Sequence, residues 1–314
     1  MTDLGWGIAA TGGIARTVAA VIAAEPGMRV AAVGSRSLER AAAFAAEFGG
    51  TPYDSYEALC ADPAVGAVYI ATPHAQHLEV AEAAIAAGKA VLCEKPLTAS
   101  VADTEHMVRL ARAAGVFLME AMWMRFNPLI QLVKERVTDI RSVQASFGFA
   151  HAFDPAHRLF APELGGGALL DLGIYPMGLA QYLLGEPESM TMTGSLAPTG
   201  VDAEAGGVMI YPGGRKALVE VSLLADYPDT ASVVGTELRA DIDAHFWAPR
   251  RVVLSGPGVE PSEHLLDPAD NGYAGELREV RAALAEGRTE SPVMPLDETL
   301  AMARLLASAR DQLH

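Results

Sequence analysis

Short apolar runs alternate with stretches of helical periodicity in the first third of the chain. The runs MRVAAVGS, AVYIAT, KAVLCE and VFLME are typical of buried strands, and LERAAAFAAEFG and HLEVAEAAIAAG have the spacing of helices. Ser100 with Asp103 three residues later fits a capping box, while Gly88 and Gly115 fit C-terminal helix caps. Strands that alternate with helices predict βαβ units and a parallel sheet.

Beyond Met122 the polarity instead alternates with a period of two. The runs SVQASFGF, ESMTMTGSL, GGVMIYPGGRKALVEVSLL and ELRADIDAHF show this pattern, and the third contains a Pro-Gly-Gly turn. One helix, predicted to begin near Gly167, interrupts the strands, and LDETLAMARLLASARDQL closes the chain as an amphipathic helix.

These patterns predict an α/β protein of two domains. We expect a doubly wound, Rossmann-type parallel sheet over residues 1–122, and an α+β domain with a large, mostly antiparallel open sheet over residues 123–314. The C-terminal helix of the second domain is expected to pack back on the first. The length of 314 residues, half of them apolar, agrees with two domains that each have a core.

Composition narrows the classes of function. A net charge of -16 argues against a nucleic-acid partner, because phosphate binding needs a basic surface. The apolar stretches are short and the amino terminus lacks a basic region, so neither a membrane span nor a signal peptide is predicted. Cys60 and Cys93 alone offer no disulfide framework and no cysteine-rich metal site, which fits a reduced cytoplasm.

A glycine turn between the first predicted strand and helix indicates a nucleotide site. In WGIAATGGIARTVAAVIA a strand leads into Gly12 and Gly13 and then a helix, which directs helix N-terminal amides at a pyrophosphate. The G-x-G-x-x-G/A fingerprint is incomplete, since Ala10 occupies the place of its first glycine and Ala15 the third. A structural turn without a ligand is the alternative interpretation of this segment.

The end of the second predicted strand bears on the choice of cofactor. Ser35, Arg36 and Ser37 stand where an NAD enzyme normally carries an acid for the ribose hydroxyls. A guanidinium there suits a 2′-phosphate, which it binds as a bidentate fork, so we expect NADP(H) to be preferred over NAD(H). Ser37 fits a helix N-cap equally well, and Arg40 is interpreted as a solvated helix charge.

Two charged residues end the strand in VLCEKPLTAS. Buried parallel strands are nearly continuous apolar runs, so Glu94 and Lys95 belong at the carboxyl end of the sheet, where open α/β sheets bind ligands. A surface ion pair at a strand exit is the alternative, and the two are equally compatible with position alone.

Asp171 and Tyr175 form the second candidate pair. On a helix, residues four apart project about 40 degrees from each other, so a carboxylate and a phenol would share one face. A phenol with pKa ~10 is a poor base near neutrality, but a lysine at ~4 Å contributes up to ~4 kcal/mol, or roughly 3 pKa units. A tyrosine packed by its ring beside a capping Asp171 is the alternative.

Motifs along essentially the whole chain resemble those of the Gfo/Idh/MocA oxidoreductases. They are the glycine turn, Ser-Arg after the second strand, ATPHAQH, EKP, MEAMWMRFNP and GGGALLDLGIYP, in this order. The segment MEAMWMRFNP, and Tyr175 where many members carry His, resemble most the dihydrodiol dehydrogenase and NADP-dependent D-xylose dehydrogenase branch. Ala10 departs from the usual first glycine, which puts the tightness of pyrophosphate binding in question.

The resemblance implies roles for individual residues. It implies that Lys95 and Tyr175 are catalytic and face the nicotinamide, that Asp171 binds substrate hydroxyls, that Glu94 orients the site, and that Arg158 contacts substrate. The cofactor-binding residues that it implies are Gly12, Gly13, Ile14, Ser35, Arg36, Thr72, Pro73, His77, Glu94, Lys95, Trp123 and Arg125. His74 and His77 lack a third ligand nearby, so no metal is expected.

The expected function is NADP-dependent hydride transfer to or from a hydroxyl or carbonyl carbon of a sugar or cyclic diol. Tyr175 would move the proton, with Lys95 as its electrostatic partner. An NAD-dependent inositol or keto-sugar oxidoreductase is one alternative, disfavoured by Arg36. A non-catalytic NADP-sensing regulator is another, disfavoured by the joint presence of Lys95, Asp171 and Tyr175. The resemblance also implies a homodimer through the second domain's sheet, with a tetramer as the alternative.

Overall fold

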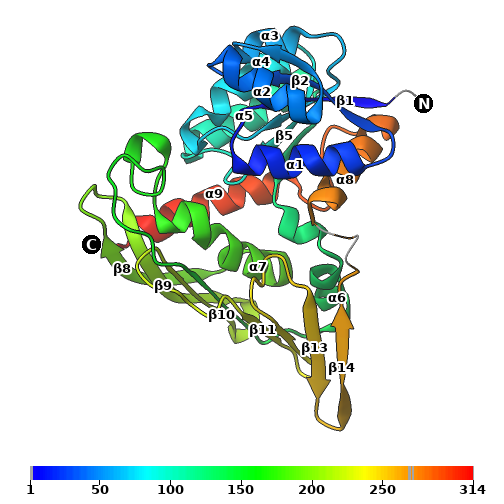
Figure 1. Cartoon of the computed structure of the whole chain (residues 1–314). Coiled ribbons are helices and arrows are strands. Elements are labelled where there is room, and N and C mark those ends of the chain that lie inside the picture. Colours follow the sequence, from blue (N-terminus) through cyan, green and yellow to red (C-terminus); the bar gives the residue numbers. More distant parts are fainter. Residues whose placement is uncertain (1–2, 268–269, 271, 314) are drawn as a thin grey trace. The chain divides into compact units, whose positions relative to one another are not determined.

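A computed structural model of the protein describes residues 3–267, 270 and 272–313 (Figure 1). The chain forms two compact units. The first holds the chain up to Met122 together with Tyr273–Leu300, and the second holds Trp123–Gly272 and the chain from Ala301 onward. The segment 123–314, expected as one domain, is therefore shared between the two units. No helix in the described ranges is long and apolar enough to cross a bilayer.

The first unit is built on six parallel strands in the order β3-β2-β1-β4-β5-β6. This confirms the predicted doubly wound sheet. Its central strands are apolar throughout, and side chains such as Ile8, Val68 and Leu92 have no exposed surface. The strands are β1 Leu4–Ala9, β2 Met28–Gly34, β3 Thr51–Tyr53, β4 Ala67–Ile70, β5 Ala90–Glu94 and β6 Leu118–Ala121. The helices are α1 Gly13–Ala24, α2 Leu38–Phe48, α3 Tyr56–Ala61, α4 His77–Ala86, α5 Val101–Ala114 and α8 Gly272–Glu286, with a 3₁₀ turn η1 at His74–Gln76.

Serine hydroxyls begin three of these helices. In α2, α3 and α5 the hydroxyl accepts the backbone N–H three residues further on, which satisfies one donor of the first turn. The serines are Ser37, Ser55 and Ser100. Helix α5 ends at Gly115, whose φ of 63° lies in the left-handed region, so the predicted cap at each end of this helix is confirmed.

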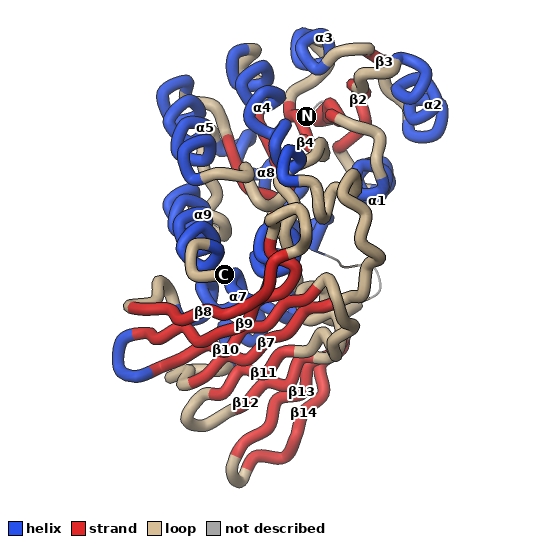
Figure 2. Tube along the Cα trace, turned by 90° about the vertical axis from the view of Figure 1, so that its left-hand side faces the viewer, coloured by secondary structure: helices blue, strands red, loops and turns tan. Residues whose placement is uncertain are grey.

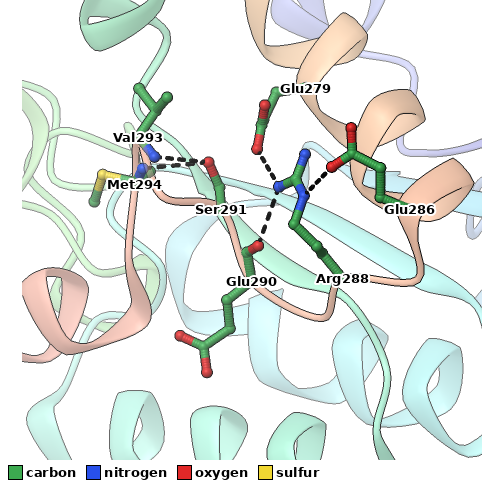
Figure 3. A network of polar contacts seen from close by, with 7 residues as sticks. All are labelled: Glu279, Glu286, Arg288, Glu290, Ser291, Val293 and Met294. Atoms are coloured by element: carbon green, nitrogen blue, oxygen red, sulfur yellow. Dashed lines mark hydrogen bonds and ion pairs between the residues drawn. The ribbon is translucent and has the colours of Figure 1, made fainter.

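The segment that follows α8 lies against the outer strand of this sheet. The N–H of Leu118 on β6 donates to the carbonyl of Thr289 at 3.2 Å. Arg288 holds the segment in place, because its guanidinium donates to Glu279, Glu286 and the carbonyl of Glu290 (Figure 3). An edge strand carries unpaired backbone groups, and the segment after α8 covers part of the β6 edge by accepting the Leu118 N–H. Helix α9, Leu296–Arg310, follows it.

The second unit contains eight strands in the order β14-β13-β12-β11-β7-β10-β9-β8. Its neighbours are antiparallel except β7 and β10, which confirms the predicted mostly antiparallel sheet. Helix α7, Ile174–Leu184, lies along one face (Figure 1), and the strands face the viewer uncovered in Figure 2. The strands are β7 Ser142–Gly148, β8 Ser189–Leu196, β9 Asp202–Tyr211, β10 Arg215–Ser222, β11 Ala231–Val234, β12 Arg239–Ile242, β13 Arg251–Gly256 and β14 Val259–Leu265.

The predicted helix among these strands is confirmed as α7, but a helix before the strands was not predicted and the first turn of the interrupting helix is not α-helical. Helix α6, Pro128–Arg136, precedes β7, and it starts at Asn127, whose side chain accepts the N–H of Leu129 at 2.9 Å. The helix predicted near Gly167 begins as a π-helical turn, η4 Leu169–Gly173, before it continues as α7. Short 3₁₀ turns complete the unit at η2 Trp123–Phe126, η3 Pro162–Leu164 and η5 Pro212–Gly214, the last being the predicted hairpin turn between β9 and β10.

Candidate active site

The turn before α1 has room for an anion. Helix α1 begins at Gly13 behind Gly12, and no side chain caps it. A Cβ placed on Gly12 or Gly13 would meet nothing within 4 Å, and Ile14 follows in the first turn. Uncapped N–H groups at a helix start, next to open space, are the arrangement that binds pyrophosphate. The geometry of these residues therefore fits the dinucleotide site that the sequence predicts at this turn.

Ala10 has an unusual backbone at this turn. Its φ is 106°, a value that glycine adopts freely and that strains a residue with a Cβ. The position that departs from the fingerprint therefore has a backbone conformation that suits glycine better than alanine.

Two guanidinium groups lie at the end of β2. Ser37 caps α2, and Ser35 accepts the N–H of Ser37 at 3.3 Å, so both hydroxyls are engaged locally. Arg36 and Arg40 are exposed, and neither has an ion-pair partner in the described part of the chain. Burial raises the pKa of Tyr56, and the charges of Arg36 and Arg40 act in the opposite direction, which places both cations near the same phenol.

His77 ties together two loops at the carboxyl edge of the first sheet. Its ring has no exposed surface; Nε2 lies 2.8 Å from the carbonyl of Thr72, and Nδ1 lies 3.1 Å from those of Pro96 and Leu97. Burial lowers the pKa of this imidazole. A ring covered on all sides acts on a cofactor only through the loops that it joins. Thr72, which precedes Pro73, leaves its buried hydroxyl oxygen without a partner among the described residues.

Glu94 and Lys95 end β5. The Glu94 carboxylate accepts the hydroxyl of Tyr69 and, at 3.3 Å, the N–H of Lys95, so it fixes the backbone at the strand exit. Lys95 is half-buried and precedes a cis peptide bond to Pro96. Behind the pair lies Glu276 on α8, fully buried, and its oxygens have no hydrogen-bond partner within the described ranges. Burial and the Glu94 charge raise the pKa of Glu276 well above its usual range.

The second unit holds Asp171 and Tyr175 in consecutive turns of one helix. Asp171 lies in the π-helical turn and Tyr175 in the first turn of α7, not in one regular α-helix as predicted. The indole N–H of Trp123 donates to the phenol oxygen of Tyr175 at 3.0 Å. A hydrogen bond to this oxygen favours its anionic form and fixes its direction.

Arg158 approaches the same helix from the loop after β7. Its Nη1 lies 3.1 Å from Oδ1 of Asp171. The side chain of Asp171 is 10% exposed and that of Arg158 is 51% exposed, so the carboxylate is covered while the guanidinium still meets solvent. The structure thus joins Arg158, Asp171, Tyr175 and Trp123 in one cluster.

Two aromatic residues of this cluster were not predicted. Phe147 on β7 stacks on Trp247 with ring centroids 3.7 Å apart, and both lie within 6 Å of the Tyr175 ring. Alternation along β7 indicated that Phe147 faces inward, but nothing connected it to Trp247, which stands between β12 and β13. Trp247 also lines an open hollow of about 640 Å³ with Asp243, His245 and Arg250.

Arg125 is enclosed within the second unit. Its side chain is 1% exposed, donates to Gln181 at 3.1 Å and lies 5.0 Å above the ring of Tyr182. In this position it supports α7. Among the described residues no group of His, Cys, Asp or Glu side chains is arranged to hold a metal ion.

Comparisons with known proteins agree over the whole chain. Residues 4–122 match the Gfo/Idh/MocA oxidoreductase family with its NAD-binding Rossmann fold, and residues 130–240 match the Gfo/Idh/MocA C-terminal domain. A trans-1,2-dihydrobenzene-1,2-diol dehydrogenase from Mus musculus is 39% identical over 322 residues, covering 98% of this chain and 96% of its own. The same-named protein from Sus scrofa is 37% identical with the same coverage.

Two solved structures share the fold at lower identity. A 3-ketoreductase from Actinomadura kijaniata in complex with NADP and TDP-benzene superposes with a TM-score of 0.88 at 27% identity, covering 100% of this chain and 98% of its own. An aldose-aldose oxidoreductase from Caulobacter crescentus complexed with glycerol gives 0.88 at 26% identity, covering 99% and 97%.

Proposed function

Because the chain belongs to the Gfo/Idh/MocA family of oxidoreductases, we propose that it transfers hydride between NADP(H) and a hydroxyl-bearing carbon of a cyclic diol or an aldose. The observation that carries this proposal is the cluster in which Trp123 donates to the oxygen of Tyr175 beside Asp171. A phenol with a fixed oxygen next to a carboxylate suits proton exchange with a substrate hydroxyl. The names of the relatives support diols and sugars as substrates.

Each side chain has a role in the proposed reaction. The nicotinamide, when bound, accepts or supplies the hydride. Tyr175 exchanges the proton with the substrate oxygen, and the Trp123 N–H stabilises charge on the phenol oxygen. Asp171 accepts a hydrogen bond from a neighbouring substrate hydroxyl, and Lys95 supplies a positive charge that favours the phenolate. Glu94 orients Lys95 by holding its backbone N–H.

A preference for NADP(H) is supported by the cations at the end of β2. Arg36 is exposed there, at the place where an NAD enzyme normally carries an acidic residue. Arg36 and Arg40 both lie near the phenol of Tyr56. A guanidinium pairs with a 2′-phosphate in a bidentate, charge-assisted fork. The open glycine turn at Gly12 and Gly13 supplies the pyrophosphate site.

The test is a substrate screen with both cofactors. Purified protein is incubated with trans-dihydrodiols of aromatic rings, aldoses and inositols, and reduced cofactor is followed at 340 nm with NADP⁺ and with NAD⁺. We expect turnover of a trans-dihydrodiol or an aldose with NADP⁺, and its loss in Tyr175→Phe. Activity with inositols and NAD⁺ alone, or turnover that Tyr175→Phe leaves intact, would contradict the proposal.

The uncovered face of the second unit's sheet is proposed as the interface of a homodimer. Val208 and Leu218 are direct neighbours on β9 and β10, and Leu218 and Ile210 are 39% and 37% exposed on strands that alternate polar and apolar. Light scattering at micromolar concentration should report a dimer or larger, and Leu218→Arg should reduce it to a monomer. A monomer before any substitution would rule the interface out.

A further inference from the structure

Asp202 is a buried carboxylate at the start of β9. It is 1% exposed, and its Oδ2 accepts the N–H of Leu169 at 2.5 Å, with a further backbone bond from Ala168. Both N–H groups belong to the start of the π-helical turn, where donors have no acceptor inside the helix. Burial raises the pKa of Asp202, while these N–H groups and the charge of Arg310 act in the opposite direction. The Asp202 carboxylate on β9 therefore accepts hydrogen bonds from backbone N–H groups at the start of the helix, which have no acceptor within the helix itself.

The other carboxylate oxygen packs against Gly167. Oδ1 has no hydrogen-bond partner in the described residues, and a Cβ built on Gly167 would lie 2.4 Å from it. The φ of Gly167 is 124°, which a residue with a Cβ adopts only under strain. Glycine at this place thus lets the carboxylate approach the helix.

Leu169 connects Asp202 to the register of the turn. Its N–H is held by Asp202, and its carbonyl accepts the N–H of Ile174 five residues later, which is the hydrogen bond of a π-helix. In a regular α-helix the same carbonyl would accept from Gly173. Ile174 directly precedes Tyr175 in the chain. Asp202 is therefore linked to the backbone beside the phenol through Leu169, whose N–H bonds to Asp202 and whose carbonyl bonds to Ile174.

We propose that Asp202 is the positioning residue that holds this turn in its π-helical register and so sets the directions of Asp171 and Tyr175. The inference rests on the proposed function, in which both side chains act on the substrate. When the carboxylate is removed, the Leu169 N–H loses its anchor, the peptide can shift, and the Leu169 carbonyl can exchange the N–H of Ile174 for that of Gly173. One residue of register turns a helical side chain by about 100°. A phenol turned by that amount leaves the indole N–H of Trp123.

The test compares Asp202→Ala and Asp202→Asn with Glu204→Gln. Glu204 lies two residues along β9 and accepts the Ser195 hydroxyl, so this control removes the same charge without touching the helix. Turnover, NADPH affinity by fluorescence and the ultraviolet titration of the Tyr175 phenol, taken as the difference from Tyr175→Phe, are measured for each. We expect Asp202→Ala to lose at least tenfold in kcat and to shift the phenol titration, with NADPH affinity changed less than twofold.

The milder variant keeps the test decisive if Asp202→Ala does not fold. Asp202→Asn retains an amide oxygen that can accept from Leu169, so it should lose less kcat and shift the phenol titration in the same direction. Glu204→Gln should match the unmodified protein. If a folded Asp202 variant keeps kcat within twofold and an unshifted phenol titration, the positioning role is overturned.

The phenol titration separates this inference from the proposed function. Should the unmodified protein turn over none of the screened substrates, the proposed function fails, yet a shifted titration in Asp202→Asn still supports the positioning role. An unshifted titration in that case removes both.

A double-substitution cycle with Gly167→Ala gives an independent measurement. Gly167→Ala should lower kcat strongly in the unmodified protein, because the new Cβ displaces the carboxylate. In Asp202→Ala the same change should cost several-fold less, since the oxygen at 2.4 Å is gone. Losses that simply multiply would show that the two residues act separately and would contradict the mechanism.

Discussion

The two units hold their candidate site residues in different ways. In the first unit Gly12, Arg36 and Lys95 each stand at a strand end or a helix start, and their place follows from the nearest backbone turn. In the second unit Tyr175 is placed by Trp123 and by the stacked rings of Phe147 and Trp247, which come from distant segments. Local placement allows one residue to change without disturbing the next, whereas a shared cluster makes its members interdependent.

This difference has a kinetic consequence. Substitutions at the turns of the first unit should change cofactor affinity and leave turnover nearly intact. Substitutions in the cluster of the second unit should change turnover and behave non-additively. Lys95 is the exception in the first unit, since the proposed function gives it a part in turnover.

The largest effect is expected for Tyr175→Phe and Lys95→Met. Each should lower kcat by roughly 10²- to 10⁴-fold, the usual contribution of a proton-transfer group, while NADPH affinity changes little. The double variant should resemble the worse single variant, because both act in one step. Tyr182→Phe, on the same helix beneath Lys134, is the matched control. Near-normal turnover of Tyr175→Phe at all pH values would assign the proton to another group, with Asp171 the first to examine.

The next largest effect concerns the choice of cofactor. Arg36→Ala should weaken NADPH binding by about 1.5–3 kcal/mol, the range for a hydrogen bond to a charged group, and NADH binding much less. Titration of both cofactors by fluorescence measures it, with Arg29→Ala on the exposed side of β2 as the control. Equal losses for the two cofactors would remove Arg36 from the 2′-phosphate.

Glu276→Gln should change how the free energy of unfolding depends on pH, without changing cofactor affinity. The folded-state pKa of Glu276 is raised, so its contribution to stability is complete below its unfolded pKa and is lost as the pH rises toward the folded value. In that window the unmodified protein should lose about 1.4 kcal/mol per pH unit relative to Glu276→Gln. Urea unfolding from pH 5 to 8 measures the difference. Glu286→Gln, exposed on the same helix, loses a contact with Arg288 but should give a curve parallel to that of the unmodified protein. A parallel curve for Glu276→Gln would instead show that the Glu276 carboxyl ionises freely.

The smallest effect is expected at Ala10. Replacement by glycine relieves a φ of 106° and should stabilise the protein by about 1 kcal/mol, the strain being partly offset by the greater freedom of glycine when unfolded. NADPH affinity should rise several-fold, because the turn no longer resists the approach of the pyrophosphate. Ala9→Gly, in the strand just before, should destabilise instead. A destabilised Ala10→Gly variant would mean that the alanine conformation is not strained.

Much of the fold could be predicted because its signals are local. Periodicity indicated all the parallel strands of the first unit's centre, and Ser100 and Gly115 marked the ends of a helix where the structure has them. Helix α6 was missed because it is short, although Asn127 and Pro128 are a typical helix start. The return of Tyr273–Leu300 to the first unit depends on long-range packing, and no local pattern reports it.

The candidate site divides in the same manner. The positions of Arg36 and Lys95 after strand ends could be predicted because apolar runs in the sequence show where a strand ends. The π-helical turn under Asp171 was not, because it differs from an α-helix by one hydrogen bond, and Asp202, whose carboxylate holds Leu169, is 33 residues away. The pairing of Phe147 with Trp247 likewise needs the packed sheet to become visible.

The return of the chain after α8 has a consequence for biosynthesis. A ribosome delivers the strands of the first unit early, but Thr289, which covers β6, and the Arg288 network that holds it (Figure 3) emerge only after the whole of Trp123–Gly272 has been made. Until then the edge of β6 and the site to be filled by α8 stay open to other chains. The unit whose translation begins first is thus incomplete until Tyr273–Leu300 has been made, and its nascent form is the stage at which chaperone protection matters most.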